Sequence, residues 1–370
     1  MNDSSFDACI VGGGPAGLAA AIALQRQGLR TTVLDRSVPL IDKACGEALM
    51  PDGVPVLREL GIEAPRSIGF HFNGIRFLDN HSSVTADFPV GTGLALRRTA
   101  LHELLIRAAE QAGVAVRWGV KNVHLREHAI VCNGRPVKAR WIVGADGQNS
   151  QIRKQARLDS CGTEHRRYGF RQHFGIAPWS SYVELYWGAK CQAYVTPVAK
   201  DETGIAVISS NPQMRVREAL REFPDLEQRI RGVSPTTREM GGLSTTRKLR
   251  TVYRGRIALI GDASGSVDAI TGEGLCLSFK QALTLAEAIK AERLKDYQAE
   301  HIRLSRRPHT MASLMLALAQ YPRLQNRALA SLAKRPAIFE MLLAIHIGQR
   351  SFLDLWPRSL FEFSAGLLGT

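Results

Sequence analysis

The sequence predicts an α/β fold: a parallel sheet of the nucleotide-binding kind, interleaved with an antiparallel-sheet domain and followed by helices. Three patterns among the 370 residues predict it. Buried strand patterns run into glycine turns at three distant places, four strand patterns follow one another without helices, and the C-terminal region is rich in Leu and Ala. We expect residues 1–70, 96–160 and 241–290 in the first domain, 71–95 and 161–240 in the second, and 291–370 in the helical region.

The first strand pattern, residues 6–11, leads directly into a glycine-rich turn and an Ala/Leu-rich helix. The glycines at Gly12, Gly14 and Gly17 have the G-x-G-x-x-G spacing of a Rossmann-like turn. The first glycine permits the tight turn, the second lets a diphosphate approach the backbone, and the third lets helix and strand pack closely. The diphosphate would lie at the helix N-terminus, where free N–H groups favour an anion.

Further strand ends extend this pattern. A second strand, residues 31–34, ends in Asp35, and an acid about 20 residues after such a turn is placed to accept from a ribose hydroxyl. Two more buried strand patterns end in the turns Gly144–Gly147 and Gly261–Ala263. Because the carboxyl ends of parallel strands meet at one edge of a sheet, all three turns should face one crevice. The sequence therefore predicts that one extended dinucleotide touches all of them.

Between residues 168 and 210 the pattern changes to four strand-like runs at close spacing. Such runs without intervening helices predict an antiparallel sheet. We expect one face of this sheet to serve as a platform for the substrate, with His173, Trp187 and Tyr194 lining it. The alternative for each of the three is an ordinary core side chain.

Composition restricts the classes of partner. The formal net charge of +14 attracts anions, such as phosphorylated cofactors, acidic carrier proteins or anionic lipid. The basic residues are scattered and not interleaved with aromatics, so we expect no nucleic-acid partner. The six cysteines form no C-x-x-C pair, which predicts reduced thiols, no metal site and a cytoplasmic location. We expect neither a signal peptide nor a membrane-spanning segment.

In order and spacing, the three glycine turns resemble those of the para-hydroxybenzoate hydroxylase superfamily of FAD-dependent oxidoreductases, over about residues 5–290. The resemblance implies FAD as the cofactor. It also implies a helix-start arginine that contacts FAD, here Arg98 with Arg97 as the neighbouring alternative. The implied cofactor-binding residues are Gly12, Gly14, Pro15, Ala16, Gly17, Asp35, Arg36, Arg98, Asp146, Gly147, Gly261, Asp262, Gly272 and Gly274.

Within the superfamily, the segments Cys45–Glu47 and Asp268–Gly274 look closest to the geranylgeranyl-reductase-like branch. The first segment should face the flavin in this fold, so Cys45 and Glu47 are the candidate catalytic residues. Their structural alternatives are a small buried hydrophobe and a loop cap. A second G-x-G-x-x-G is absent from the sequence, so NAD(P)H would bind transiently as the reductant, or electrons would arrive from a partner protein.

Three functions remain open at this point. The first is an FAD-dependent monooxygenase or related oxidoreductase acting on a hydrophobic small molecule of polyketide, aromatic or isoprenoid type, either free or bound to a carrier. The second is a geranylgeranyl-reductase-like ene reductase, and the third is a flavin-binding docking protein without turnover. Residues 311–370 alternate cationic and apolar stretches. We expect them to pack as a cap over the substrate route, with peripheral membrane contact as the alternative.

Overall fold

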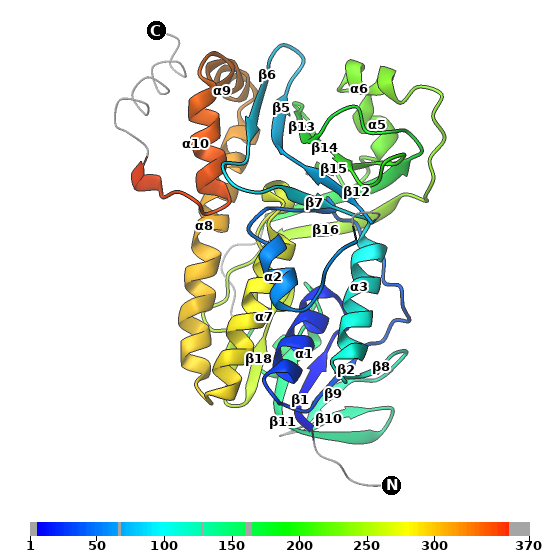
Figure 1. The fold of residues 1–370 in the computed structure, drawn as a ribbon, viewed down its shortest axis with the longest axis vertical. Coiled ribbons are helices and arrows are strands. Elements are labelled where there is room, and N and C mark those ends of the chain that lie inside the picture. Colours follow the sequence, from blue (N-terminus) through cyan, green and yellow to red (C-terminus); the bar gives the residue numbers. More distant parts are fainter. Residues whose placement is uncertain (1–5, 66–67, 127–128, 160–164, 355–370) are drawn as a thin grey trace.

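The computed structural model describes residues 6–65, 68–126, 129–159 and 165–354. It has two lobes stacked along the long axis, with a long helical layer down one side (Figure 1). The N-terminal strand lies in one lobe, and the strands from the middle of the chain form the other. This arrangement confirms the predicted fold class of a parallel sheet, an antiparallel sheet and C-terminal helices.

The first lobe is built on an eight-stranded sheet whose main path is β17-β18-β11-β1-β2-β8. Register explains how three distant turns meet. Val11 pairs with Gly144 and with Leu34, and Gly144 pairs with Leu259, so these strand ends form one row. The strands are β1 (Phe6–Val11), β2 (Thr31–Leu34), β8 (Ala115–Arg117), β9 (His124–Arg126), β10 (Ala129–Cys132), β11 (Arg135–Gly144), β17 (Tyr253–Arg254) and β18 (Ile257–Leu259).

Helices cover this sheet because their apolar residues need a partner surface. The Ala-rich helix α1 (Pro15–Arg26) is buried over most of its length and packs on both α3 (Arg98–Gln111) and α7 (Gly274–Lys290). Short helices α2 (Val54–Glu59) and α4 (Gln151–Gln155) complete the lobe. Small Ala side chains let α1 approach its neighbours closely.

The second lobe contains a seven-stranded sheet in the order β16-β12-β15-β14-β13-β5-β6. The four predicted strands are all present, and β5 pairs with β13 in parallel. The expected domain boundary at residue 241 falls inside β16, which belongs to this sheet. The elements are β5 (Gly74–Leu78), β6 (Ser83–Asp87), β12 (His165–Phe174), β13 (Tyr182–Trp187), β14 (Cys191–Pro197), β15 (Thr203–Ser209), α5 (Val216–Leu220), α6 (Pro224–Arg229) and β16 (Met240–Thr246).

A small three-stranded sheet joins the lobes, with β7 (Gly93–Ala95) between β3 (Ala48–Leu49) and β4 (Phe70–Phe72). The stretch 70–88 forms three strands, and the chain between Arg117 and His124 forms none. Asn133 and Gly134 form a hairpin turn between β10 and β11, with both residues at positive φ.

The helical layer consists of α8 (Leu294–Gln320), α9 (Pro322–Lys334) and α10 (Pro336–His346), with 3-10 turns η1 (Gly261–Ser264), η2 (Ala269–Thr271) and η3 (Phe352–Asp354) elsewhere. Helix α8 continues through Pro308 and runs beside both lobes (Figure 1). Helices α9 and α10 pack against β6, so this part of the expected cap is attached to the second lobe. No helix in the described part of the chain is long and apolar enough to cross a membrane. Residues 355–370 of the expected cap lie outside the described residues.

Candidate active site

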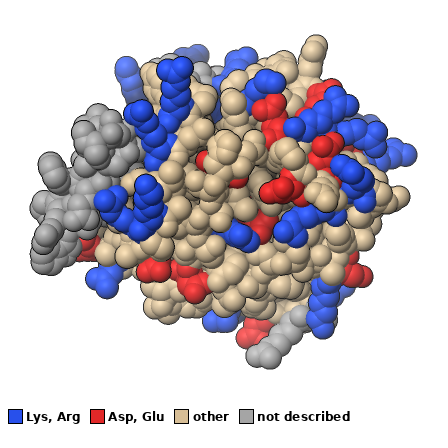
Figure 2. All heavy atoms as spheres, turned by 90° about the horizontal axis from the view of Figure 1, so that it is seen from above, with Lys and Arg blue, Asp and Glu red and all other residues tan. Residues whose placement is uncertain are grey.

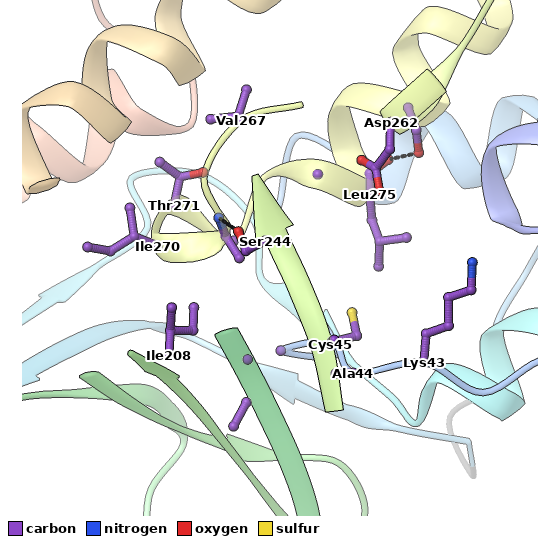
Figure 3. Close-up of a pocket in the computed structure, with 18 of the residues that line it drawn as sticks. Lys43, Ala44, Cys45, Ile208, Ser244, Asp262, Val267, Ile270, Thr271 and Leu275 are labelled. Atoms are coloured by element: carbon purple, nitrogen blue, oxygen red, sulfur yellow. Dashed lines mark hydrogen bonds between the residues drawn. The ribbon is translucent and has the colours of Figure 1, made fainter. Parts of the chain in front are cut away.

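A cavity of about 1240 Å³ lies between the lobes and the helical layer. Its walls come from the row of strand ends, the loop before β3, one face of the seven-stranded sheet and helices α8 to α10. Figure 3 shows Asp262 and Lys43 at one end of the view, Ile208 and Ile270 at the other, and Cys45 between them. The cavity therefore has a polar end at the parallel sheet and an apolar end beneath the helices.

The first glycine turn shows why each glycine is needed. A Cβ on Gly12, which has φ of +114°, would lie 2.3 Å from the Ala145 carbonyl oxygen, and one on Gly17 would lie 1.9 Å from the Gly12 oxygen. These two glycines are required by protein packing. A Cβ on Gly14 would meet nothing within 4 Å, although Gly14 lines the cavity at the N-terminus of α1. The free space at Gly14 is therefore space for a ligand.

Asp35 stabilises the same turn. One carboxylate oxygen accepts from the Gly13 N–H at 2.6 Å, and the other accepts from the Ser37 N–H at 2.7 Å. Asp35 and the exposed Arg36 both line the cavity. Each carboxylate oxygen has a second lone pair, so Asp35 retains the capacity to accept from a ribose hydroxyl.

The two arginines at the start of α3 are separated by the structure. Arg98 lines the cavity, and no described residue accepts a hydrogen bond from its buried Nε. Arg97 instead approaches Glu202, with 3.8 Å between guanidinium nitrogen and carboxylate oxygen, and is absent from the cavity lining. The geometry therefore favours Arg98 over Arg97 as the ligand-facing residue.

Each of the other two strand-end turns provides an acid. One acid is hydrogen-bonded within the protein, and the other has no hydrogen-bond partner among the described residues. Asp146 accepts from the Ser150 hydroxyl at 2.5 Å and from the Gln151 N–H at 2.7 Å, so it caps α4 at the cavity wall. Asp262 is exposed to the cavity, and its carboxylate has no hydrogen-bond partner among the described residues. Although Asp262 faces the open cavity, the surrounding protein partly desolvates it and raises its pKa, while the charges of Lys43, Arg98 and Arg153 oppose that shift.

The remaining glycines of the predicted set surround the start of α7. Gly261 has φ of +59°, and Gly272 has φ of +68° at the end of η2. A Cβ on Gly274 would meet nothing within 4 Å, so the first turn of α7 is open to the cavity. Pro15, Ala16 and Gly147 also line the cavity. The other predicted cofactor-binding residues line it too, except Gly17 and Gly261, which are packing positions.

The Cys45–Glu47 loop reaches the middle of the cavity. The Cys45 sulfur accepts the Glu47 N–H at 3.4 Å and lies between the two ends of the cavity (Figure 3). Glu47 has φ of +60° and is only 3 % exposed. Its carboxylate accepts from the Arg98 N–H at 2.7 Å and from Arg171 at 3.1 Å, and it lies 2.6 Å from His173 Nε2. Glu47 thus joins three elements.

The three predicted substrate residues divide into two groups. His173 is fully buried in the ion cluster with Glu47 and Arg171 and is absent from the cavity lining, so the expectation that it lines the platform needs correcting. Trp187 and Tyr194 do line the cavity. Burial raises the pKa of Tyr194, and its hydroxyl donates to the Ile270 carbonyl at 2.7 Å.

Sequence reasoning missed His102 on α3. It is fully buried: its Nδ1 accepts the Ile41 N–H at 3.0 Å, and its Nε2 donates to the Gly13 carbonyl at 2.8 Å. These partners fix one neutral tautomer, which ties the first glycine turn to the loop before β3. Its position beside Leu101 on the buried face of the predicted helix was the available signal.

The apolar end was predicted only in outline. Phe77 stacks on Trp187 with ring centroids 5.4 Å apart and contacts Phe339 at 4.8 Å, joining β5, β13 and α10. The helical layer adds a further apolar group of lining residues: Met311, Leu314, Met315, Leu318, Leu324, Leu329, Leu332, Leu342 and Leu343. Their contribution depends on how α8 to α10 fold back over the sheet, which no short motif encodes.

Comparison with known proteins agrees with this geometry. The sequence model of the FAD-binding domain family matches residues 5–304. A menaquinone reductase of Mycobacterium tuberculosis is 27% identical over 79% of this chain and 78% of its own length. A 6-methylpretetramide 4-monooxygenase of Streptomyces rimosus is 26% identical over 89% and 87%. A digeranylgeranylglycerophospholipid reductase of Methanocaldococcus jannaschii is 24% identical over 82% and 81%.

The p-nitrophenol 4-monooxygenase structure from Pseudomonas putida has the same fold, with a TM-score of 0.78, 18% identity, and coverage of 94% of this chain and 99% of that one. The cavity also fits the cofactor on its own features. Gly14 leaves space at a helix N-terminus for a diphosphate, and Asp262 presents a free carboxylate to accept from ligand hydroxyls. Since the family match spans most of the chain and the cavity fits the ligand, the protein belongs to the FAD-binding domain family, with FAD as its cofactor.

Proposed function

We propose that the protein is an FAD-dependent monooxygenase that acts on a hydrophobic small molecule and takes its electrons from NAD(P)H. The observation that carries the proposal is the continuity of one cavity, polar where the cofactor-binding turns lie and apolar beneath the helical layer. Bound FAD supplies the redox chemistry, exchanging electrons with a nicotinamide nucleotide and with oxygen or the substrate. The protein supplies binding, orientation and exclusion of water.

The apolar walls suit that task. Trp187, Phe77 and Phe339 form an aromatic cluster at the substrate end, backed by the aliphatic residues of α8 to α10. Such surroundings hold an apolar substrate and keep water away from reactive oxygen species. Polar groups are few here, and the Tyr194 hydroxyl is already engaged with a backbone carbonyl. We infer that shape and apolar contact select the substrate, and that hydrogen bonds contribute little.

The test is a pair of coupled measurements on the purified, flavin-loaded protein. NADH or NADPH oxidation should consume oxygen and should accelerate when a hydrophobic aromatic or isoprenoid compound is added. Mass spectrometry under ¹⁸O₂ should then show one labelled oxygen atom in the product. A product formed equally well under nitrogen, with two added hydrogens and no oxygen, would overturn the monooxygenase assignment. Protein from which FAD has been removed is the control for non-enzymatic oxidation.

The second candidate is an ene reductase, and the position of Cys45 is the observation that favours it. Transfer of hydride to an alkene needs a proton donor at the other carbon. The Cys45 sulfur accepts the Glu47 N–H, which leaves its S–H free, and Figure 3 places the sulfur toward the middle of the cavity. Glu47 fits this role less well, because its carboxylate is held by Arg171 and the Arg98 N–H.

Replacing Cys45 by Ala separates the two candidates. If Cys45 donates the proton, Cys45→Ala should retain full FAD content and flavin reduction by NAD(P)H but lose alkene reduction by roughly 100-fold or more. Under the monooxygenase assignment the variant should keep its oxygen-dependent turnover within a few fold. Cys276→Ala is a matched control, because that thiol is 2 % exposed at the start of α7 and burial raises its pKa.

A further inference from the structure

Helix α9 has two opposite surfaces. Its inner face, with Ala328, Leu329 and Leu332, is buried and lines the apolar end of the cavity. Its outer face carries Arg323, Arg327 and Lys334, all exposed. The helix contains no Asp or Glu. The apolar end of the cavity and a row of cations therefore lie on opposite faces of the same helix.

Charge is unevenly distributed around this helix. Residues 311–339 contain four Lys or Arg and no acid, whereas the whole chain has 34 acidic residues among 370. In Figure 2, which looks down on the end of the molecule where α9 lies, the blue side chains at the upper left stand together without red ones among them, whereas blue and red side chains are interspersed on the right. A cationic surface of this kind attracts an anionic partner.

Exposed apolar side chains lie beside these cations. Tyr321, between α8 and α9, is 61% exposed, and Leu314 on α8 is 48% exposed. Both also line the cavity. Residues that are at once strongly exposed and part of the cavity wall form the rim of an opening. The apolar end of the cavity therefore opens next to the cationic face of α9.

We propose that the outer face of α9, together with Leu314 and Tyr321, docks on an anionic membrane surface, so that the apolar end of the cavity opens toward lipid. An interfacial site needs apolar side chains that enter the acyl boundary and cations that meet lipid headgroups. This surface supplies both. Docking itself is independent of the reaction, whereas delivery of a lipid-soluble substrate through the opening rests on the function proposed above.

The alternative partner is an acidic protein, such as a carrier that delivers the substrate. An acidic protein would engage the cations, whereas an anionic bilayer engages the cations and also offers an acyl phase for Leu314 and Tyr321. The exposed apolar rim therefore favours a bilayer, and the two partners differ in a measurable way. Bilayer contact requires Tyr321 to reach the acyl chains, whereas electrostatic contact with a protein leaves it at an aqueous interface.

The first test is co-sedimentation of the flavin-loaded protein with vesicles of phosphatidylcholine alone or containing phosphatidylglycerol. We expect binding only to the anionic vesicles, and weakening from 50 to 500 mM salt because surface charges are screened. Replacing Arg323, Arg327 and Lys334 together by Glu should lower the affinity by roughly 100-fold or more, since each cation near an anionic surface contributes about one tenfold step or slightly less. The control replaces the exposed Arg58, Lys154 and Lys290 by Glu, which changes the net charge equally.

The second test places a reporter at the rim. The Tyr321→Trp variant should gain emission that is quenched by lipids brominated in their acyl chains, above the quenching of the parent protein. Absence of binding to anionic vesicles at low salt would overturn the proposal, as would equal losses in both charge variants. Binding without quenching at residue 321 would also overturn it, in favour of a purely electrostatic surface. FAD content and NAD(P)H oxidation in detergent should stay unchanged in both charge variants, so failure of docking is distinguishable from failure of the proposed reaction.

Discussion

The two ends of the cavity are built in opposite ways. At the polar end, a few backbone turns at the ends of neighbouring strands present glycines and acids to the ligand, and each turn is a short sequence segment. At the apolar end, side chains from β5, β13 and α8 to α10 come together across about 270 residues of chain. The polar end is defined by backbone shape, and the apolar end by side-chain packing. Substitutions should therefore affect cofactor binding at one end and stability or substrate affinity at the other.

The largest expected effect is at Gly14. The Gly14→Val variant should lose FAD affinity by roughly 100-fold or more, because its side chain would fill the space beside the N-terminus of α1. Since a Cβ there meets no protein atom within 4 Å, the apoprotein should keep its secondary structure and its unfolding midpoint. Flavin absorbance after gel filtration and circular dichroism measure the two effects.

Gly17→Val is the matched comparison for Gly14. Its Cβ would lie 1.9 Å from the Gly12 carbonyl oxygen, so it should destabilise the fold itself as well as abolish flavin binding. If Gly14→Val unfolds as readily as Gly17→Val, then Gly14 is a packing residue and the space beside it is not a ligand site.

The next effect in size is at Glu47, which holds the two ends together. Glu47→Ala should lower the free energy of unfolding by about 3–5 kcal/mol, because it leaves the buried Arg171 without one of its carboxylate partners. Asp42, 2.6 Å from Arg171, is the remaining partner and limits the loss to the lower part of that range. Urea denaturation of the flavin-loaded protein measures this change.

Turnover distinguishes a structural Glu47 from a catalytic one. Glu47→Gln keeps the size and can still accept from the Arg98 N–H, so much of the stability should return. If turnover returns with stability, Glu47 positions the loop before β3. If Glu47→Gln is stable and binds FAD but is inactive, the carboxylate takes part in the chemistry.

A smaller effect is expected at Phe339 in the apolar end. Phe339→Ala removes the ring that contacts Phe77 and should cost about 3 kcal/mol, the lower part of the range for such truncations, because the side chain borders an existing cavity. FAD content should not change. KM for a hydrophobic substrate should rise severalfold, with NAD(P)H-dependent flavin reduction unaffected. Loss of FAD from this variant would contradict the separation of the two ends.

The same contrast explains what the sequence could and could not predict. The glycine turns and the acids at the strand ends were predictable because turn geometry is local and strand ends meet wherever a parallel sheet forms. The four central strands were predictable from their spacing. The fold class and the cofactor were confirmed, whereas the roles of individual residues stay predictions until variants are measured.

The failures arose where long-range packing decides. His173 belongs to a strand with the expected alternation, but its partners Glu47 and Thr237 lie far away in sequence and draw it into an ion cluster. The contribution of α8 to α10 to the cavity was equally hidden, because the apolar periodicity of a helix does not specify which surface it covers.

The smallest expected effect concerns His102, the residue that ties the first glycine turn to the loop before β3. Burial lowers the pKa of His102 below its ordinary value of 6.5, and nearby Arg98 adds to the shift while the Gly13 carbonyl and Asp35 oppose it. The folded protein therefore binds a proton at His102 less readily than the unfolded chain. Its contribution to stability is present above about pH 6.5 and is lost as the pH falls through and below that value.

Protonation of Nδ1 also removes the acceptor for the Ile41 N–H, so the loop should loosen from the turn and FAD affinity should fall over the same pH range. His102→Gln tests this, because an amide can replace both hydrogen bonds but does not titrate. The buried His301 and His309, whose pKa values burial lowers to about 4, also destabilise the protein in acid, so the informative quantity is the difference between the two proteins. Between pH 7.5 and 5 the parent should lose more stability than His102→Gln, and parallel pH profiles would show that His102 has no such role.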